Sequence, residues 1–397
     1  MKELLNISSN LVNSVNQDFK RFLYDEITWS ERLIGIKGAR GTGKTTLILQ
    51  WLQNQDLPVE KAAYFSLDDL YFTTRSLLDT IDEFHNHGGE IVLLDEVHKY
   101  PGWSREIKNM YDRYPSLKII FTGSSIINIS RETADLSRRA IMYELPGLSF
   151  REYLAFKGIL NKPPFTLPEI IEKSSNIFRI FPSGFKPLEY FSDYLSHGYY
   201  PFYNDNQDDY YQRLRQLTRL IVEFDMSELK GFDSRNSKKM LQLLSIISLQ
   251  VPFKPNIKKL AERSSIHRNS MNSYLIYLED ARLIKMLYPS GSSIATLQKP
   301  EKIFLENTNM IYALAEGEPE KGNIRETFFY NQLSVSHNVK APRKGDFEVN
   351  QKFLFEVGGR NKTQKQIAGI PNSYLALDDT ESGYKNEIPL WLFGFLY

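Results

Sequence analysis

Eight residues near the N-terminus fit the pattern G-x-x-x-x-G-K-[ST] (Walker A), which is typical of loops that bind phosphate groups. They are Gly38-Ala39-Arg40-Gly41-Thr42-Gly43-Lys44-Thr45. Glycines permit positive φ, so successive backbone N–H groups can turn toward a polyphosphate. Lys44 is predicted to reach the β and γ phosphates, and the Thr45 hydroxyl to bind Mg²⁺. With Thr46 in the following helix, these residues form the predicted nucleotide-binding set.

A second stretch supplies the carboxylates that such a site needs. An apolar run ends in two acids in Ile91-Val92-Leu93-Leu94-Asp95-Glu96, the Walker B pattern. Asp95 is predicted to hold Mg²⁺, largely through water, because ligands gather at the carboxyl ends of parallel strands. Glu96 is the candidate general base that polarises the attacking water. The alternative for Glu96 is a surface acid that caps the next helix.

The elements around the loop have the required order. Leu33–Lys37 is predicted as a strand before the loop, and Thr45–Leu52 as a helix after it. From residue 31 to 150 strands and helices alternate, which predicts an α/β domain with a parallel sheet. The candidate strands are Leu33–Lys37, Ala62–Leu67, Ile91–Leu94, Lys118–Thr122 and Ala140–Leu145. The alternative is a glycine-rich turn in an α/β domain without a nucleotide site.

Further polar side chains could complete the catalytic set. The strand Lys118–Thr122 ends in hydroxyls, and of Thr122, Ser124 and Ser125 we favour Ser124 for contact with the γ phosphate; a helix cap is the alternative. Arg138 and Arg139 are candidates for an arginine finger, acting in the same chain or a neighbour, with solvated surface arginines as the alternative. Arg40 is a candidate for contact with phosphate or a partner domain.

Composition limits the other functions. The 397 residues suggest two to four domains, and the net charge of +1 argues against attraction of the whole surface to nucleic acid or membrane. The chain has no cysteine, which excludes disulfides, thiolate zinc sites and cysteine nucleophiles. No signal peptide or membrane-spanning run is visible, so we expect a cytoplasmic location. The apolar run Ile388–Tyr397 is interpreted as a buried strand.

Three stretches together resemble a known group of proteins. They are Leu94 to Trp103 (LDEVHKYPGW), Phe121 to Ser125 (FTGSS) and Tyr143 to Leu154 (YELPGLSFREYL). They resemble the bacterial and archaeal AAA-type ATPases that carry a second domain of unknown function at the C-terminus, most strongly over residues 31–155. The resemblance implies an ATPase core followed by helical, winged-helix-like and nuclease-like parts. The choice of ATP over GTP rests on this resemblance alone, because no N-K-x-D motif that would read guanine lies in this domain.

The rest of the chain is divided by composition. Residues 1–30 are predicted as a helical lead-in to the ATPase domain at 31–150, with Leu11, Val15, Phe19, Phe22 and Leu23 near helical spacing. Residues 151–235 are rich in aromatic side chains and predicted to be helical. His197, in the sequence His-Gly-Tyr-Tyr-Pro, is interpreted as a packed turn residue rather than a metal ligand.

Residues 236–288 are predicted to form a winged helix. They contain nine Lys or Arg against three Asp or Glu. Candidate phosphate contacts are Lys258, Lys259, Arg263, His267 and Arg268, and candidate base contacts are Asn269, Asn272 and Ser273. DNA is therefore a possible partner; the alternative is a module that packs against protein.

Residues 289–397 are predicted to be a small α+β, nuclease-like domain, with strands at Lys302–Leu305, Asp346–Val349, Lys352–Val357 and Ser373–Leu377. Asp346 and Glu356 could share a metal ion on adjacent strands. Members of the group often have Glu-x-Lys here, whereas this chain has Glu356-Val357-Gly358, with Lys362 or Lys365 as possible substitutes. We expect a degenerate site, in a domain used for structure or docking.

The sequence thus predicts an ATPase that binds and hydrolyses Mg-ATP, and whose nucleotide state switches C-terminal domains that engage DNA or a protein partner. Two alternatives remain open at this point. One is a nucleotide-dependent binding switch with negligible turnover, and the other is a metal-dependent nuclease with an ATPase accessory. An oligomer is possible, and no membrane contact is expected.

Overall fold

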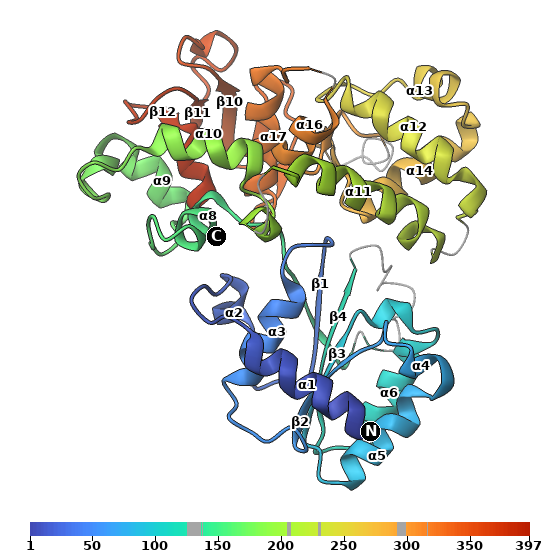
Figure 1. Cartoon of the computed structure of the whole chain (residues 1–397). Helices are drawn as coiled ribbons and strands as arrows, with labels where there is room; N and C mark the ends of the chain where they lie inside the picture. The colour runs from blue at the N-terminus through green and yellow to red at the C-terminus, as the bar shows by residue number, and fades with distance from the viewer. Residues whose placement is uncertain (125–135, 137, 205–207, 229–231, 292–298, 316) are drawn as a thin grey trace. The chain divides into compact units, whose positions relative to one another are not determined.

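In the computed structural model the chain divides into two units, Met1–Gly147 and Leu148–Tyr397 (Figure 1). The structure describes residues 1–124, 136, 138–204, 208–228, 232–291, 299–315 and 317–397. The finer division into five parts stays a prediction.

The N-terminal unit contains a five-stranded parallel sheet with the strand order β2-β3-β4-β1-β5. All five predicted strands are confirmed. Because the strands are parallel, the residues that follow the carboxyl ends of β1, β3 and β4 lie along one edge of the sheet. The strands are β1 (Leu33–Gly38), β2 (Ala62–Ser66), β3 (Ile91–Asp95), β4 (Lys118–Ser124) and β5 (Ile141–Glu144).

Helices cover both faces of this sheet. Successive strand residues point to opposite faces, and both sets are apolar here, so each face packs against helices. Ile34, Ile36 and Ile120 pack with the residues of α3 (Lys44–Gln53). Leu33, Ile119 and Phe121 pack on the other face with α5 (Leu77–Asn86) and α6 (Trp103–Arg113). The unit also contains two short elements, α4 (Tyr71–Thr74) and the 3₁₀ helix η1 (Val97–Lys99).

The N-terminal segment is less helical than predicted. Helix α1 covers Lys2–Ser14 and ends where Val15 becomes extended, and α2 covers only Leu23–Glu26. Leu4 and Ser8 form the buried face of α1, whereas the predicted inward residue Leu11 is 38% exposed. The Ser8 hydroxyl accepts a 2.8 Å hydrogen bond from the backbone N–H of Tyr64. Helix α1 therefore packs along the outer strand β2.

The C-terminal unit starts with helices, as predicted for residues 151–235. The elements up to the first hairpin are α8 (Phe150–Phe156), α9 (Leu167–Lys173), η2 (Ser174–Arg179), α10 (Pro187–His197), η3 (Pro201–Asn204), α11 (Tyr210–Glu223), η4 (Asp225–Glu228), η5 (Ser234–Asn236), α12 (Ser237–Ser248), α13 (Ile257–Ser264) and α14 (Arg268–Asp280). The antiparallel pair β6 (Ile284–Leu287) and β7 (Lys302–Leu305) follows. The winged-helix interpretation of α12 to β7 stays a prediction.

A mixed sheet with the order β12-β11-β10-β9-β8 forms the last part of the unit. Strands β10, β11 and β12 are parallel, and β8, β9 and β10 are antiparallel neighbours. The four predicted strands correspond to β7, β9, β10 and β11. The remaining elements are α16 (Thr308–Leu314), α17 (Lys321–Leu333), β8 (Val339–Lys340), β9 (Phe347–Val349), β10 (Phe353–Gly358), η6 (Gln364–Gln366), β11 (Ser373–Leu377), β12 (Glu387–Pro389) and η7 (Leu390–Phe395).

The prediction of a strand over Ile388–Tyr397 is wrong for most of that run. Only Glu387–Pro389 is a strand, and Leu390–Phe395 is a buried 3₁₀ helix. A continuous apolar run fits either a strand buried on both faces or a buried helical segment, so its pattern does not decide between them. Gly394 is needed here, because a Cβ at this position would lie 2.4 Å from Cβ of Phe150.

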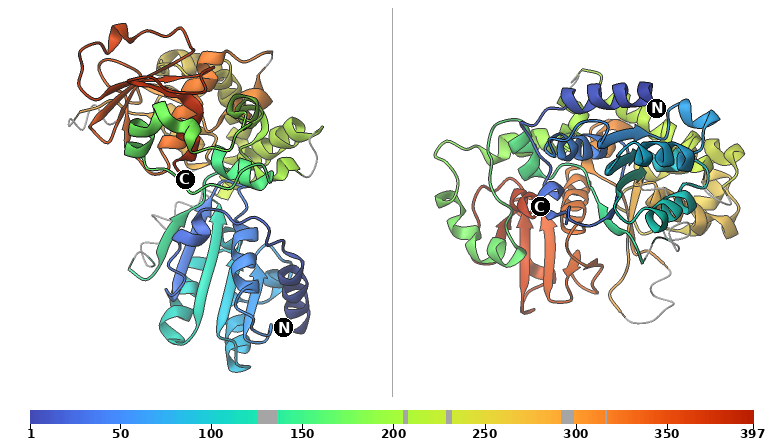
Figure 2. Two further views of the ribbon diagram at one scale, coloured as in Figure 1. Left: turned by 90° about the vertical axis from the view of Figure 1, so that its left-hand side faces the viewer. Right: turned by 90° about the horizontal axis from the view of Figure 1, so that it is seen from below.

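One hydrophobic core joins the two halves of the C-terminal unit. Phe150, Phe191 and Tyr194 from its first helices pack with Phe328 of α17 and Phe395 of η7. Figure 2 shows the C-terminal sheet, in red and orange, beside these green helices.

Within the described ranges, no helix has the length and apolar character that crossing a membrane requires.

Candidate nucleotide site

The predicted phosphate loop joins the end of β1 to the start of α3. Gly41 and Gly43 have φ of 81° and 93°, which favours glycine at both positions. A Cβ on Gly38 would lie 2.4 Å from the carbonyl oxygen of Leu145, so the close approach of the chain after β5 requires glycine. Helix α3 begins at Lys44, and its N-terminal amides therefore border the loop, as an anion site needs.

Lys44 folds back over the loop. Its side chain is buried, and Nζ donates hydrogen bonds of 3.1 Å to the carbonyl oxygens of Gly38 and Ala39. The Thr42 hydroxyl also donates to Ala39, at 2.9 Å. The ammonium group is thereby held within the loop that it is predicted to serve. Thr46 is exposed on the first turn of α3.

Asp95 brings the two sequence motifs together. Its carboxylate is buried at the end of β3, where Oδ2 accepts hydrogen bonds from Thr45 Oγ1 (2.7 Å) and Tyr64 OH (2.8 Å). Oδ1 accepts a hydrogen bond from Thr122 Oγ1 of β4. A hydroxyl and a carboxylate in contact are oxygen donors of the kind that Mg²⁺ prefers, so Thr45 and Asp95 fit the predicted metal.

Glu96 lies beside the loop in a left-handed backbone conformation, with φ of 52°. Its N–H donates to Thr122 Oγ1 at 3.3 Å. Its Oε2 lies 3.9 Å from a guanidinium nitrogen of Arg40 and 3.4 Å from Nε2 of His98. The structure thus brings the proposed base next to a residue of the phosphate loop.

Two of the three candidate hydroxyls, those of Thr122 and Ser124, lie in β4 and have different neighbours. Thr122 contacts Asp95 and the backbone of Glu96, whereas Ser124 pairs in register with Gly38 at the end of β1. The backbone N–H of Ser124 donates to Nδ1 of His98 at 3.5 Å. Ser125 falls outside the described residues. The Thr122 hydroxyl therefore touches the carboxylate motif directly.

Arg138 and Arg139 lie away from the loop. They precede β5, whose residue Ile141 pairs with Ile34 near the start of β1, at the opposite edge of the sheet from Gly38. Arg138 is exposed, and Arg139 forms a bidentate pair with Asp112 of α6, at 2.9 and 3.0 Å. Their position does not support a role in the site of the same chain, and action on a neighbouring chain stays a prediction.

Sequence reasoning missed three residues of this site: Arg21, Tyr64 and His98. Arg21 is buried and donates to the carbonyl oxygens of Thr42, Pro146 (2.8 Å) and Gly147 (3.0 Å). A tyrosine inside the apolar run of β2, and a histidine two residues after Glu96, were the available signals. Neither carries a spacing rule, because the contacts of Tyr64 with Asp95 and of His98 with Ser124 join segments that are distant in the sequence.

Each of the two predicted carboxylates of the C-terminal sheet, Asp346 and Glu356, lies close to a lysine. Asp346 accepts a 2.9 Å hydrogen bond from the N–H of Val357, which places it beside β10. Glu356 is buried, with Oε1 at 2.9 Å from Lys362 Nζ, while Asp346 Oδ1 lies 3.7 Å from Lys302 Nζ. Lys365 is exposed. Over the described ranges no three His, Cys, Asp or Glu side chains are grouped to hold a metal ion. The degenerate nuclease-like site at Asp346 and Glu356 stays a prediction, with an active nuclease as its alternative.

The predicted DNA-contacting residues lie on an exposed surface of α13 and α14. Met271, Leu275 and Leu278 form the buried face of α14, so the opposite face is open. Within this surface, Lys258 Nζ lies 4.0 Å from a carboxylate oxygen of Glu262. The exposed residues are Lys258, Lys259, Arg263, His267, Arg268, Asn269, Asn272 and Ser273.

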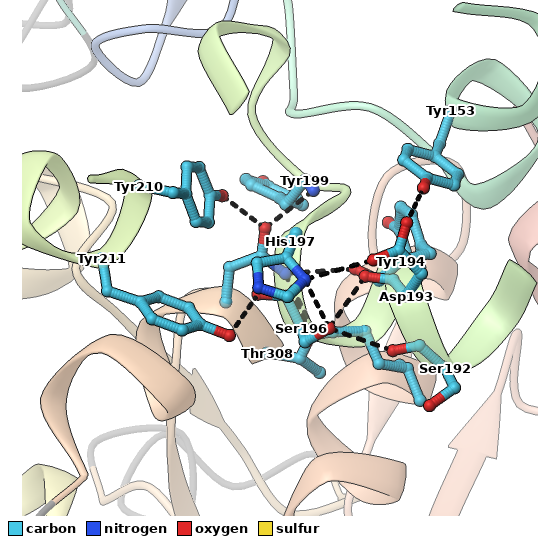
Figure 3. A network of polar contacts seen from close by, with 12 residues as sticks. Tyr153, Ser192, Asp193, Tyr194, Ser196, His197, Tyr199, Tyr210, Tyr211 and Thr308 are labelled. Atoms are coloured by element: carbon cyan, nitrogen blue, oxygen red, sulfur yellow. Dashed lines mark hydrogen bonds and ion pairs between the residues drawn. The ribbon is translucent and has the colours of Figure 1, made fainter. Parts of the chain in front are cut away.

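His197 is part of a polar network at the end of α10 (Figure 3). Its Nδ1 lies 2.7 Å from Ser196 Oγ and 3.2 Å from Asp193 Oδ1, and its ring stacks on those of Tyr203 and Tyr211. Ser196 and Asp193 share the same ring nitrogen, so the three side chains do not form the relay that a nucleophilic serine requires. The packed interpretation of His197 fits this geometry.

Two family models match parts of the chain. Residues 30–154 match the model of an AAA domain, and residues 188–321 match that of a domain of unknown function. A curated relative is the uncharacterized protein MJ1637 of Methanocaldococcus jannaschii, which is 28% identical over 315 residues. The match covers 74% of the present chain and 66% of that protein, slightly less than two thirds of the relative's length.

The solved structures that match this chain do so with TM-scores of about 0.3. DnaA bound to AMPPCP and single-stranded DNA has 16% identity over 68% of this chain and 92% of that chain, with a TM-score of 0.31. AMPPCP-bound DnaA from Aquifex aeolicus has 15% identity, coverage of 70% and 88%, and a TM-score of 0.28. The S. cerevisiae Hsp104-ADP complex has 18% identity, coverage of 69% and 41%, and a TM-score of 0.32. At TM-scores this low, the likeness carries no conclusion about the present chain.

Proposed function

We propose that residues 30–154, which match the model of an AAA domain, form a P-loop ATPase domain that binds Mg-ATP and hydrolyses it to ADP and phosphate. The observation that carries the proposal is the 2.7 Å hydrogen bond from Thr45 to Asp95. It joins the phosphate loop to the carboxylate strand, although the two residues are 50 positions apart in the sequence. A glycine-rich turn without a nucleotide site has no need for this contact.

Binding would use groups that the loop already holds in place. The amides of the loop and of the first turn of α3 would surround the phosphates, and Lys44 Nζ would exchange two carbonyl partners for phosphate oxygens. Mg²⁺ held by Thr45 and, through water, by Asp95 would neutralise charge on the β and γ phosphates. The hydroxyls of Tyr64 and Thr122 hold the Asp95 carboxylate in place.

Hydrolysis would use Glu96 as the base. The water oxygen forms a bond to the γ-phosphorus while the bond from that phosphorus to the β–γ bridging oxygen breaks. The electron pair of that bond leaves with ADP, and the proton of the water passes to Glu96. The side chain of Glu96 is 21% exposed and borders the loop through Arg40, so it is accessible to water.

Two variants separate binding from hydrolysis. Glu96→Gln should retain ATP binding by calorimetry and lower the ATPase rate by about 10²- to 10⁴-fold, the usual contribution of a general base. Lys44→Ala should lower ATP affinity by roughly 10- to 100-fold, since a hydrogen bond to a charged group contributes about 1.5–3 kcal/mol.

Lys61→Ala is the matched control, because Lys61 is a half-exposed lysine of the same unit that pairs with Glu90 at 2.8 Å. It should leave binding and turnover unchanged. Equal ATPase rates for Glu96→Gln and the parent would remove the assignment of Glu96. Binding without turnover in the parent would favour the nucleotide-dependent switch instead.

For the C-terminal unit we propose that nucleotide state changes its engagement of DNA or a protein partner. The support is the exposed polar and basic side of α13 and α14, which has the composition expected for contact with phosphates. ATP turnover measured with and without DNA tests this coupling directly. A partner that is engaged only by the nucleotide-bound form should change the turnover rate.

A further inference from the structure

The side chain of His98 lies between the proposed base and the strand that ends at Ser124. His98 belongs to the 3₁₀ helix η1, which begins directly after Glu96, and its side chain is only 7% exposed. Its Nδ1 lies 3.5 Å from the backbone nitrogen of Ser124, and its Nε2 lies 3.4 Å from Glu96 Oε2. One imidazole thus spans from the backbone of β4 to the carboxylate.

The contact with Ser124 determines which ring nitrogen carries the proton. A backbone N–H can only donate, so Nδ1 must accept, and the neutral ring then has its proton on Nε2. Burial, followed by the charges of Lys99, Lys44 and Arg40, lowers the pKa of His98 to about 3. The ring is therefore neutral at physiological pH and presents Nε2–H on the side of the Glu96 carboxylate.

This Nε2 is a buried donor whose hydrogen bond to Glu96 is not fully formed. In the part of the chain that the structure describes, it takes part in no hydrogen bond of ordinary geometry, although Glu96 Oε2 is close. A buried donor that lacks its hydrogen bond destabilises the folded state. A small rotation of Glu96, or one bridging water, would satisfy it.

The backbone conformation of Glu96 also indicates a functional role for this residue. A residue with a side chain that has φ of 52° is strained, and proteins retain such strain mainly at functional sites. Arg40 approaches the carboxylate from the phosphate loop, at 3.9 Å. The carboxylate therefore has a cation on the loop side and a neutral donor on the β4 side.

We propose that His98 is a positioning residue for hydrolysis, whose Nε2–H orients the Glu96 carboxylate so that one oxygen faces the attacking water. This inference rests on the proposed ATPase function. Ser124 contributes through its backbone N–H, which holds the imidazole in the required tautomer. His98 itself does not touch the nucleotide and exchanges no proton in the reaction.

Three substitutions of His98 distinguish this role from simple packing. His98→Asn keeps an acceptor near Nδ1 but does not reach Glu96, and His98→Leu keeps only the volume. Both should lower kcat by about 10- to 100-fold with unchanged ATP affinity, since a misplaced catalytic group costs this much. His98→Gln places an amide near the position of Nε2 and should restore kcat to within about 3-fold of the parent.

A double variant tests whether His98 acts through Glu96. In the Glu96→Gln background, His98→Asn should cause no further loss of kcat, because the group that it orients is already removed. Parent-like kcat in His98→Asn, or equal and additive losses in both backgrounds, would overturn the proposal.

A measurement on the unmodified protein is independent of turnover and of the folding of any variant. The ¹⁵N shifts of the six histidines should include one ring that stays neutral, with the proton on Nε2, down to about pH 4. The opposite tautomer for His98 would overturn the proposal even in an active ATPase. Absence of hydrolysis in the parent, with the expected tautomer, would instead contradict the proposed function.

Discussion

The hydroxyl of Tyr64, on β2, donates a 2.8 Å hydrogen bond to Oδ2 of Asp95 at the end of β3. The two strands are parallel neighbours, with Ser66 opposite Asp95, so the long tyrosine side chain reaches the carboxylate from two residues earlier. Burial, and then the charge of Asp95, raise the pKa of Tyr64 above its ordinary value. Tyr64 is therefore protonated at neutral pH and can donate this hydrogen bond.

Tyr64→Phe should weaken the hold on Mg²⁺. The variant loses one of the three hydroxyls that orient Asp95, and such outer contacts contribute about 10-fold or more to metal affinity. We expect the Mg²⁺ concentration for half-maximal ATPase rate to rise by roughly 10-fold. Tyr143→Phe is the control, since its hydroxyl accepts only a 3.0 Å bond from Thr28 at an exposed position. Unchanged Mg²⁺ dependence in Tyr64→Phe would contradict this assignment.

Gly38→Ala should disrupt the phosphate loop. The new Cβ would lie 2.4 Å from a backbone oxygen of Leu145, which cannot turn aside like a side chain. We expect the free energy of unfolding, measured by chemical denaturation, to fall by about 1–3 kcal/mol. Calorimetry should show that ATP binding is lost. Gly322→Ala in α17 meets no atom within 4 Å and should be neutral or slightly stabilising. Retained ATP affinity in Gly38→Ala would be the contrary result.

Glu279 is predicted to make the free energy of unfolding fall as pH rises. Burial raises its pKa to about 7, with smaller contributions from Glu306 and Asp280. Between its ordinary pKa and this value, the folded state binds more protons than the unfolded state, so the free energy of unfolding falls as pH rises from about 4.5 to 7. Above that range this group has no further effect.

Glu279→Gln should remove that dependence. The amide oxygen can still accept the 2.8 Å bond from the N–H of Met286, but the side chain no longer titrates. At pH 8 the variant should be more stable than the parent by up to roughly 3 kcal/mol, with no advantage at pH 4.5. Denaturation at the two pH values measures this, with the exposed Glu262→Gln as control. A parent-like pH profile would show that the pKa of Glu279 is not raised.

DNA binding by α13 and α14 should depend on salt. Phosphate contacts release counterions, so removal of Lys259 and Arg268 should weaken affinity and reduce the salt slope by about 1 for each cationic side chain removed. Lys173→Ala is a suitable control, because Lys173 lies on α9 and pairs with Glu169 at 2.9 Å. Titration of labelled duplex at several salt concentrations gives the slopes. Salt-independent affinity, or unchanged binding in the double variant, would count against this surface.

The sequence was most informative where chemistry depends on local order. The glycines of the phosphate loop, Lys44 and the acids after β3 could be recognised because each motif is contiguous. The five strands of the first sheet could be recognised because each is a short apolar run between helical segments. Parallel strands end at one edge, so the two motifs were expected near each other; the direct hydrogen bond from Thr45 to Asp95 was not itself predicted.

The other parts of the site depend on contacts between segments that are distant in the chain. Arg21 lies in a stretch predicted to be helical, yet its side chain enters the loop because the chain is extended after Val15. The end of the chain shows the same limit, since Leu390–Phe395 is buried as a 3₁₀ helix by its fit against Phe150. No pattern of hydrophobic residues encodes such a fit.

Arg21 also links the loop to the place where the chain leaves the N-terminal unit. One guanidinium holds the carbonyl oxygen of Thr42 and those of Pro146 and Gly147, the last residues before the C-terminal unit begins. A single side chain therefore bridges the phosphate loop and the last two residues of the N-terminal unit.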